Sequence, residues 1–199
     1  MNMKGVCSAR EIVEMLESGD LVVTPLLDIK RQLGRASLDV RLGLEFVLFR
    51  RGYIPSLDAG RSRHPIADYY DRARLEYGDV FVLHPGQFAL SSTLEFFKLP
   101  SDVMAYVIGR SSWGRLGLVI ATATFVDPNF RGSITLELVN EGEVPLVLYP
   151  GTRVAQLVFH RLNEPAPPYE GKYALDTRAT ASKAHRDEEL LWLSDKEGY

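Results

Sequence analysis

The segment that decides the fold is VPLVLYPGTRVAQLVFHRL, from Val144 to Leu162. It contains two runs rich in valine, leucine and phenylalanine, with Pro150-Gly151 between them. Short apolar runs of this kind are typical of β-strands, and Pro-Gly is a pair that type II turns favour. The segment LHPGQFAL, from Leu83 to Leu90, has the same arrangement. We therefore predict a strand, a tight turn and a second strand, in the manner of a hairpin, at both places.

Further segments of the same kind extend over most of the chain. They are rich in β-branched and aromatic residues, and glycine, proline or asparagine separates them. They are LVVTPLL (21–27), SLDVRLGLEFVLFR (37–50), DVFVLHPGQFALSSTLEFFKL (79–99), DVMAYVIGR (102–110), LGLVIATATFVD (116–127) and GSITLELVN (132–140). Many short strands at regular spacing are typical of an all-β barrel or sandwich.

Three regions do not follow this strand pattern. At the N-terminus, Ser8 and Glu11 have the spacing of a capping box, and Gly19 can end the helix that follows. We therefore predict a short N-terminal helix. Residues 53–78 are polar and irregular, which indicates a long loop or insertion. Residues 163–199 begin with three prolines and read as a tail, whose DEELLWL segment can form a short helix.

Composition excludes several classes of protein. The 199 residues are 46% hydrophobic and 25% charged, which suits one globular domain. The net charge of −3 argues against a nucleic-acid-binding protein. Cys7 is the single cysteine, and the four histidines show no HxH or HxxxH spacing, so we expect no disulfide framework and no zinc site. No long apolar run or basic leader occurs, so we expect no membrane partner and a cytoplasmic location.

The segment GRSSWGRLG, from Gly109 to Gly117, could bind an anion. It follows an apolar strand and offers backbone N–H groups, two hydroxyls and two guanidiniums within a few residues. Such a turn can surround a phosphate, and guanidinium groups bind phosphate through paired hydrogen bonds. The residues alone leave a second interpretation open, a solvated turn with surface arginines.

A carboxylate in the middle of a strand is the other unusual feature. In SITLELV, Ile134, Leu136 and Leu138 share one face, and Glu137 lies on the opposite face. Glu137 could simply face solvent. It could also be a partly buried carboxylate with a raised pKa, which would suit proton transfer.

Taken in order, these motifs resemble the dCTP deaminase branch of the dUTPase-like superfamily, over roughly residues 6–162. The motifs that carry the resemblance are SLDVRLG, LHPGQFAL, Leu99-Pro100, GRSSWGRLGL, TATFVDPNFRGSITLELVN and LYPGTRVAQL. The resemblance implies a distorted, jelly-roll-like β-barrel domain with its N-terminal helix over residues 1–162. Residues 163–199 would be a tail that closes over the nucleotide site. It also implies a homotrimer with nucleotide sites at the subunit interfaces, and Mg²⁺ that arrives with the triphosphate.

The resemblance further implies a role for individual residues. Glu137 matches the general base that activates water for attack on C4 of cytosine and moves protons to the departing ammonia. Ser111 and Arg115 match residues that orient this carboxylate and the water. Arg110 and Ser112 match contacts to the phosphates from a neighbouring subunit.

Six more residues match positions that bind the nucleotide. Asp127 matches the residue near the deoxyribose 3′-hydroxyl, Phe130 an aromatic residue that packs on the sugar, and Ala123 a position whose backbone reads the base. Gln156 matches a glutamine that helps to bind the nucleotide, and Tyr169 and Lys172 match phosphate ligands from the tail. Better-known nucleobase deaminases hold zinc with HxE and PCxxC motifs, and neither occurs here, so the resemblance implies a reaction that needs no zinc.

Some positions depart from the family pattern and keep alternatives open. Ile120 stands where histidine is common, and Asp176 stands where glutamine is usual. Phe125 replaces the arginine that is frequent in members that stop at dUTP, which favours a reaction that continues to dUMP and pyrophosphate. A bifunctional enzyme, a deaminase for another cytosine nucleotide and a non-catalytic nucleotide-binding regulator are therefore alternatives. A plain dUTPase is less favoured, because the tail holds only Gly171 and Gly198 where that family has a glycine-rich motif.

Overall fold

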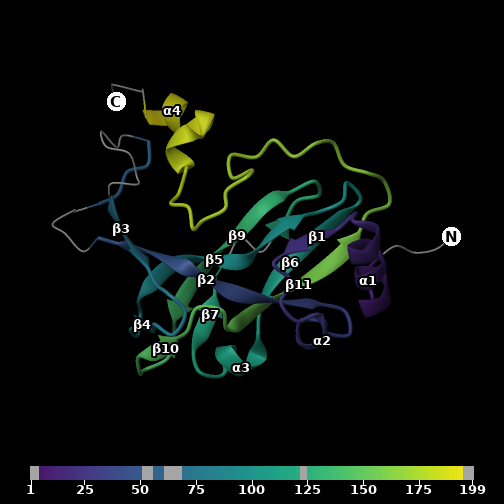
Figure 1. Ribbon diagram of the computed structural model, residues 1–199. Coiled ribbons are helices and arrows are strands. Elements are labelled where there is room, and N and C mark those ends of the chain that lie inside the picture. Colours follow the sequence, from purple (N-terminus) through teal and green to yellow (C-terminus); the bar gives the residue numbers. More distant parts are fainter. Residues whose placement is uncertain (1–4, 51–55, 61–68, 122–124, 195–199) are drawn as a thin grey trace.

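The computed structural model describes residues 5–50, 56–60, 69–121 and 125–194. Strands dominate the described residues, and Figure 1 shows them curving round a common interior, with short helices at the periphery. The all-β fold expected from the strand pattern is confirmed. The strands are β1 (Val22–Thr24), β2 (Leu38–Phe49), β3 (Tyr70–Arg74), β4 (Phe81–Leu83), β5 (Phe88–Lys98), β6 (Val103–Gly109), β7 (Leu118–Ile120), β8 (Phe125–Val126), β9 (Arg131–Asn140), β10 (Leu146–Leu148) and β11 (Arg153–Arg161).

The strands form one large antiparallel sheet and one small one. The large sheet runs β7-β9-β5-β2-β11-β6-β8, with β1 paired to β5 and β3 paired to β2. The small sheet contains only β10 and β4. Alternate side chains point inward, so Leu136 and Leu138 of β9 are fully buried together with Leu42 of β2. Each such leucine stabilises the fold by roughly 1.5–3 kcal/mol through removal of apolar surface from water.

The two Pro-Gly segments form turns but not hairpins. Gly86 and Gly151 have φ values of 68° and 84°, the left-handed conformation that a type II turn needs at this place. The strands on either side of each turn lie in different sheets, because β4 pairs with β10 while β5 and β11 belong to the large sheet. The expected hairpins are therefore wrong. Each Pro-Gly pair is a corner at which the chain passes from the small sheet to the large one.

The helices are short. The predicted N-terminal helix is confirmed as α1 (Ala9–Ser18), with both hydrogen bonds of the capping box between Ser8 and Glu11 and with Gly19 at its end. The others are α2 (Ile29–Gln32), α3 (Ser111–Gly114), η2 (Ala184–Arg186) and α4 (Glu188–Ser194). Among the described residues, none of the helices has the length and apolar character to cross a membrane.

The region expected to be an irregular loop contains a strand. Within residues 53–78, Tyr70–Arg74 forms β3 and pairs antiparallel with β2 from Phe49↔Tyr70 to Glu45↔Arg74. Its sequence YDRAR is polar because β3 is an edge strand whose side chains are largely exposed. The tail leaves β11 and returns across the large sheet, as Figure 1 shows, before it ends in the expected short helix α4.

A buried glutamate joins three elements below the sheet surface. Glu95 of β5 is 0% exposed, and its carboxylate accepts hydrogen bonds from the Arg41 backbone N–H (2.9 Å) and from Gln32 Nε2 (3.0 Å). Burial raises the pKa of Glu95 to about 7, although both hydrogen bonds act in the opposite direction. The folded protein therefore binds a proton at Glu95 over a pH range in which the unfolded chain does not.

This difference predicts how stability depends on pH. The unfolded pKa is 4.5 and the folded pKa is about 7, so the free energy of unfolding falls as pH rises between these values and is constant above them. Between pH 5 and pH 8, titration of Glu95 should lower the free energy of unfolding of the wild type by roughly 2–3 kcal/mol. We expect Glu95→Gln to lack this decrease. Urea denaturation of both proteins at pH 5 and pH 8 measures it. Exposed Glu141→Gln serves as control, and equal pH dependence in wild type and Glu95→Gln would contradict the prediction.

Candidate active site

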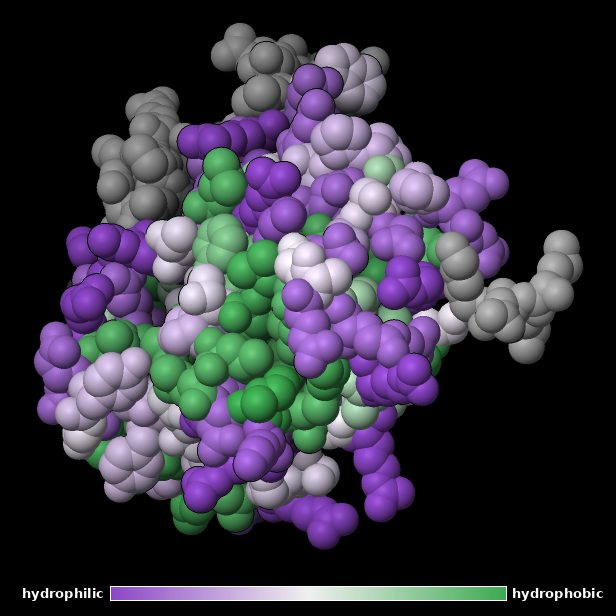
Figure 2. Space-filling model, turned by 45° about the vertical axis from the view of Figure 1, so that its right-hand side comes forward, coloured by the Kyte–Doolittle hydropathy of each residue, from purple (hydrophilic) through white to green (hydrophobic). Residues whose placement is uncertain are grey.

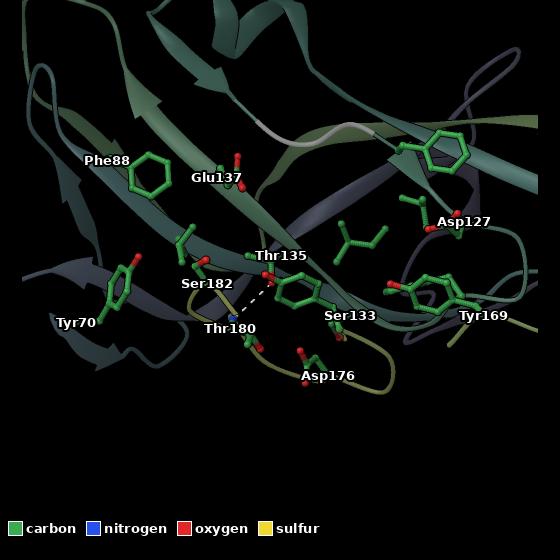
Figure 3. A pocket seen from close by; sticks show the side chains of 16 residues that line it. Tyr70, Phe88, Asp127, Ser133, Thr135, Glu137, Tyr169, Asp176, Thr180 and Ser182 are labelled. Atoms are coloured by element: carbon green, nitrogen blue, oxygen red, sulfur yellow. Dashed lines mark hydrogen bonds between the residues drawn. The ribbon is translucent and has the colours of Figure 1, made fainter. Parts of the chain in front are cut away.

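A cavity of about 340 Å³ lies between the large sheet and the returning tail. Figure 3 shows that its side chains come from β3, β5, β9, the chain around Asp127, and the tail. The residues that line it are Tyr70, Phe88, Leu90, Phe125, Val126, Asp127, Phe130, Ser133, Ile134, Thr135, Glu137, Tyr169, Tyr173, Asp176, Thr180 and Ser182. We call this cavity the Glu137 pocket.

Glu137 lies on β9 between the buried Leu136 and Leu138, and its own side chain points into the pocket. The side chain is half-buried, and burial raises the pKa of its carboxyl group. Of the two interpretations that the sequence left open, the partly buried carboxylate is therefore the one observed. A carboxylate whose pKa is raised toward neutral pH is well suited to accept and return a proton.

The opposite end of the pocket is aromatic. The Phe130 and Tyr169 rings lie 5.8 Å apart, and the Phe130 backbone N–H donates to the Asp127 carbonyl at 3.2 Å. The nearby tail is held by Asn129, whose Nδ2 donates to the carbonyls of Ala166 (3.1 Å) and Pro167 (2.9 Å). Asp127, Phe130 and Tyr169 are thus brought together at one end, and Glu137 lies toward the other (Figure 3).

A second group of residues surrounds α3. Ser111, Ser112 and Arg115 are exposed there. Arg110 precedes the helix, and its Nε lies 3.2 Å from Asp39 Oδ2 while its Nη1 donates to the Arg153 carbonyl at 3.1 Å. Of the described residues, those that line the Glu137 pocket include none between positions 110 and 115.

The α3 group continues onto β11 and β2. Ser37 Oγ donates to Gln156 Oε1 at 3.2 Å, and Gln156 lies opposite Asp39 in the β11–β2 ladder. Asp39 also pairs with Arg153 Nη1 at 3.1 Å. We call Ser37, Asp39, Arg110–Arg115, Arg153 and Gln156 the Arg110 cluster. Arg110, Arg153 and Gln156 gather around Asp39, and guanidinium groups of this kind can bind a phosphate.

Of the expected residues that the structure describes, Lys172 lies outside both groups. Lys172 forms an ion pair with Asp187 and does not line the pocket. Ala123 lies outside the described residues. Trp113, which had no assigned role, donates from Nε1 to the Arg153 carbonyl at 3.1 Å and packs against the core, so it fixes α3 on the barrel.

Several residues of the two groups were not singled out from the sequence. Asp39 and Arg153 lie in the SLDV and GTRV segments, next to residues that are buried in the strands. This alternation could have indicated that both side chains point away from the core. Tyr70, Thr180 and Ser182 had no such signal, because their segments read as a loop and a tail. Asp176 lines the pocket, and Lys183 Nζ lies 2.9 Å from its carboxylate, which offsets its charge.

Comparison with known proteins gives a consistent result. Residues 6–162 match the family model described as "dCTP deaminase-like". A "dCTP deaminase, dUMP-forming" from Methanobrevibacter smithii is 41% identical over 192 residues, which cover 93% of this chain and 98% of that protein. A "dCTP deaminase" from Halorubrum lacusprofundi is 46% identical over 162 residues, which cover 81% of this chain and 79% of that protein.

A solved structure shares the fold. The 2′-deoxycytidine 5′-triphosphate deaminase from Agrobacterium tumefaciens superimposes with a TM-score of 0.62 and 23% identity, over 79% of this chain and 48% of that chain. The family model covers residues 6–162, which include Glu137 and the whole Arg110 cluster, while the tail residues that line the Glu137 pocket lie beyond residue 162. The chain therefore belongs to the dCTP deaminase-like family.

Proposed function

We propose that this protein is a dCTP deaminase that hydrolyses dCTP to dUTP and ammonia without zinc, with Glu137 as general base. The observation that carries the proposal is the half-buried Glu137 carboxylate in a pocket with an aromatic end, in a chain of the dCTP deaminase-like family. A cytoplasmic location, beside the nucleotide pool, belongs to the same proposal.

The proposed reaction follows from the placement of the carboxylate. Glu137 takes a proton from water as the water oxygen bonds to C4 of cytosine, and this proton goes to N3 of the ring. The second water proton then moves to the amino group, the C4–N bond breaks, and ammonia departs while C4 becomes a carbonyl. Asp127 and Phe130 would hold the deoxyribose at the other end of the pocket, which fixes C4 next to Glu137.

A homotrimer completes the proposed site. Ser111 and Arg115 are required beside Glu137, yet within one chain they lie on the α3 side, away from the pocket. Next to the Arg110 cluster, the sheet exposes Tyr106, Ile108 (45%) and Phe125 (49%). Figure 2 likewise shows hydrophobic side chains gathered in the middle of one face of the molecule. Such open apolar surfaces are typical of interfaces between subunits.

Mg²⁺ would enter with the nucleotide. Within the part of the chain that the structure describes, no three His, Cys, Asp or Glu side chains are grouped closely enough to hold a metal ion. An ion that is carried on the triphosphate needs few protein ligands, because Mg²⁺ keeps several of its waters in many nucleotide sites. When bound, it would offset phosphate charge, while Arg110 and Ser112 contact the phosphates.

The second candidate function is the bifunctional reaction, in which dUTP is further hydrolysed to dUMP and pyrophosphate. Phe125 lines the Glu137 pocket, and the Methanobrevibacter smithii relative is named "dUMP-forming". The chemistry would require a second water to attack the phosphates. The position of Phe125 and the name of this relative favour the bifunctional reaction over a deaminase for another cytosine nucleotide.

One assay separates the candidates. The protein is incubated with dCTP, CTP or dUTP and Mg²⁺, and the products are separated by chromatography. We expect dCTP to be consumed with release of ammonia, and CTP to react far more slowly. Accumulation of dUTP identifies the monofunctional enzyme, and dUMP with pyrophosphate identifies the bifunctional one. Tight nucleotide binding without any product would instead indicate a regulator, and turnover of dUTP alone would indicate a dUTPase.

A further inference from the structure

Strand β3 holds part of the tail against the sheet. Arg72 Nη1 donates to the Ala179 carbonyl at 3.1 Å. Ala179 is 1% exposed and packs with Val47 of β2 and Leu90 of β5, and Tyr70 of β3 packs against the same group. Because Tyr70 and Arg72 are two residues apart on one strand, their side chains share the face that meets the tail.

The same part of the tail is bound to β9 from the other side. The Leu175 N–H donates to the Arg131 carbonyl, and the Ser133 N–H donates to the Asp176 carbonyl, both at 2.7 Å. Gly132 lies between them with φ of 153°, and a Cβ there would lie only 2.8 Å from the Asp176 carbonyl oxygen. Glycine therefore allows the tail to approach β9 this closely.

This contact reaches the strand position beside the proposed base. The Thr180 N–H donates to Thr135 Oγ1 at 3.5 Å, and Thr135 precedes Glu137 by two residues on the same face of β9. Figure 3 shows Thr180 and Ser182 near Thr135 and Glu137, with Tyr70 to one side. The tail between Leu175 and Lys183 thus lies between β3 and β9 and forms one wall of the pocket.

We propose that β3 is the docking edge for residues 175–183, and that Arg72 and Tyr70 are positioning residues that hold this segment over Glu137 and limit its access to water. The proposal rests on the proposed function in taking Glu137 as the base. It gives β3 (Tyr70–Arg74), which has no role in the nucleotide site expected from the motifs, a place in the reaction.

The charges around Glu137 indicate that the segment acts through burial. The titratable groups that share the pocket are Tyr70 from β3, Asp127, and Tyr169, Tyr173 and Asp176 from the tail. In the segment 175–183, Lys183 pairs with Asp176 and Arg178 pairs with Glu45, so neither of these two cations is left unpaired beside Glu137. Burial is accordingly the cause that raises the pKa of Glu137. If residues 175–183 leave, water reaches the carboxylate and its pKa falls toward the ordinary value.

The test compares Arg72→Met with a matched control. Arg50→Met removes an arginine just beyond β2 whose guanidinium pairs with Asp71 of β3 at an exposed site. We expect Arg72→Met to speed hydrogen exchange at the Ser133 and Thr180 amides by about fivefold, as loss of one hydrogen bond allows. The acidic limb of the kcat/KM profile for dCTP should move to lower pH, because a base with a lower pKa stays ionised in more acidic solution. Arg50→Met should change neither, and Arg72→Lys should restore part of both.

Unchanged exchange in Arg72→Met, or faster exchange without any movement of the acidic limb, would overturn the proposal. If the wild type does not deaminate dCTP, the proposed function fails by itself. Exchange and an NMR titration of the Glu137 carboxyl carbon in both variants still decide the docking inference, since neither depends on turnover.

Discussion

Glu137→Gln is expected to lower kcat for dCTP deamination by about two to four orders of magnitude, the usual contribution of a positioned general base. Glutamine keeps the size of the side chain but cannot accept a proton from water. Because Glu137 is half-buried at the side of the pocket and Leu136 and Leu138 carry the core contacts, the fold should remain intact. Steady-state ammonia release and equilibrium binding of dCTP, measured together, separate loss of chemistry from loss of binding.

The control for this variant is Glu141→Gln, just beyond the same strand, where the carboxylate is exposed. Its turnover should equal that of the wild type. Full activity of Glu137→Gln would remove Glu137 from the mechanism. Loss of dCTP binding in parallel with kcat would mean that the carboxylate holds the substrate rather than the water.

Arg115→Ala is expected to lower kcat by at least about a hundredfold, as removal of a positioned hydrogen-bond donor does. The structure adds a sharper form of this prediction, because Arg115 is exposed on the α3 side and does not line the pocket that holds Glu137 on the same chain. If one site takes Glu137 from one subunit and Arg115 from another, two inactive variants can repair each other.

The experiment mixes Glu137→Gln and Arg115→Ala subunits, refolds them together and measures ammonia release. In a random 1:1 trimer mixture, about a quarter of the sites receive both native residues, so about a quarter of wild-type activity should return. A mixture of Glu137→Gln with the double variant should stay inactive. Mixed trimers that form, as native mass spectrometry would show, but remain inactive would contradict a shared site.

Local patterns made part of the molecule predictable from sequence. The capping box of Ser8 and Glu11 acts within one turn, and α1 begins where it indicates. The period of two in SITLELV places Leu136 and Leu138 inside and Glu137 on the other face, since strand geometry alone decides it. The grouping of residues into a nucleotide site came from the resemblance of ordered motifs to a family.

Long-range contacts decided what could not be predicted. Tyr70–Arg74 reads as polar loop because an edge strand needs few apolar residues, and β2 supplies its pairing. The small side chain of Ala179 gives no sign of burial in the sequence. It is buried because it packs against Val47 and Leu90, which are distant in the chain. Pro-Gly fixes the local turn but does not specify which strand pairs with which, so the hairpin prediction failed.

The two corner turns have a consequence for synthesis of the chain. Because Pro85-Gly86 and Pro150-Gly151 direct their strands into different sheets, β4 must wait for β10, which lies far downstream, before it has a partner. Non-local pairing of this kind slows folding, as the loop between the strands must close first. On the ribosome, the small sheet can close only when residues 146–148 have emerged. Until then β4 has no partner strand, and exposed strand edges of this kind are prone to aggregation.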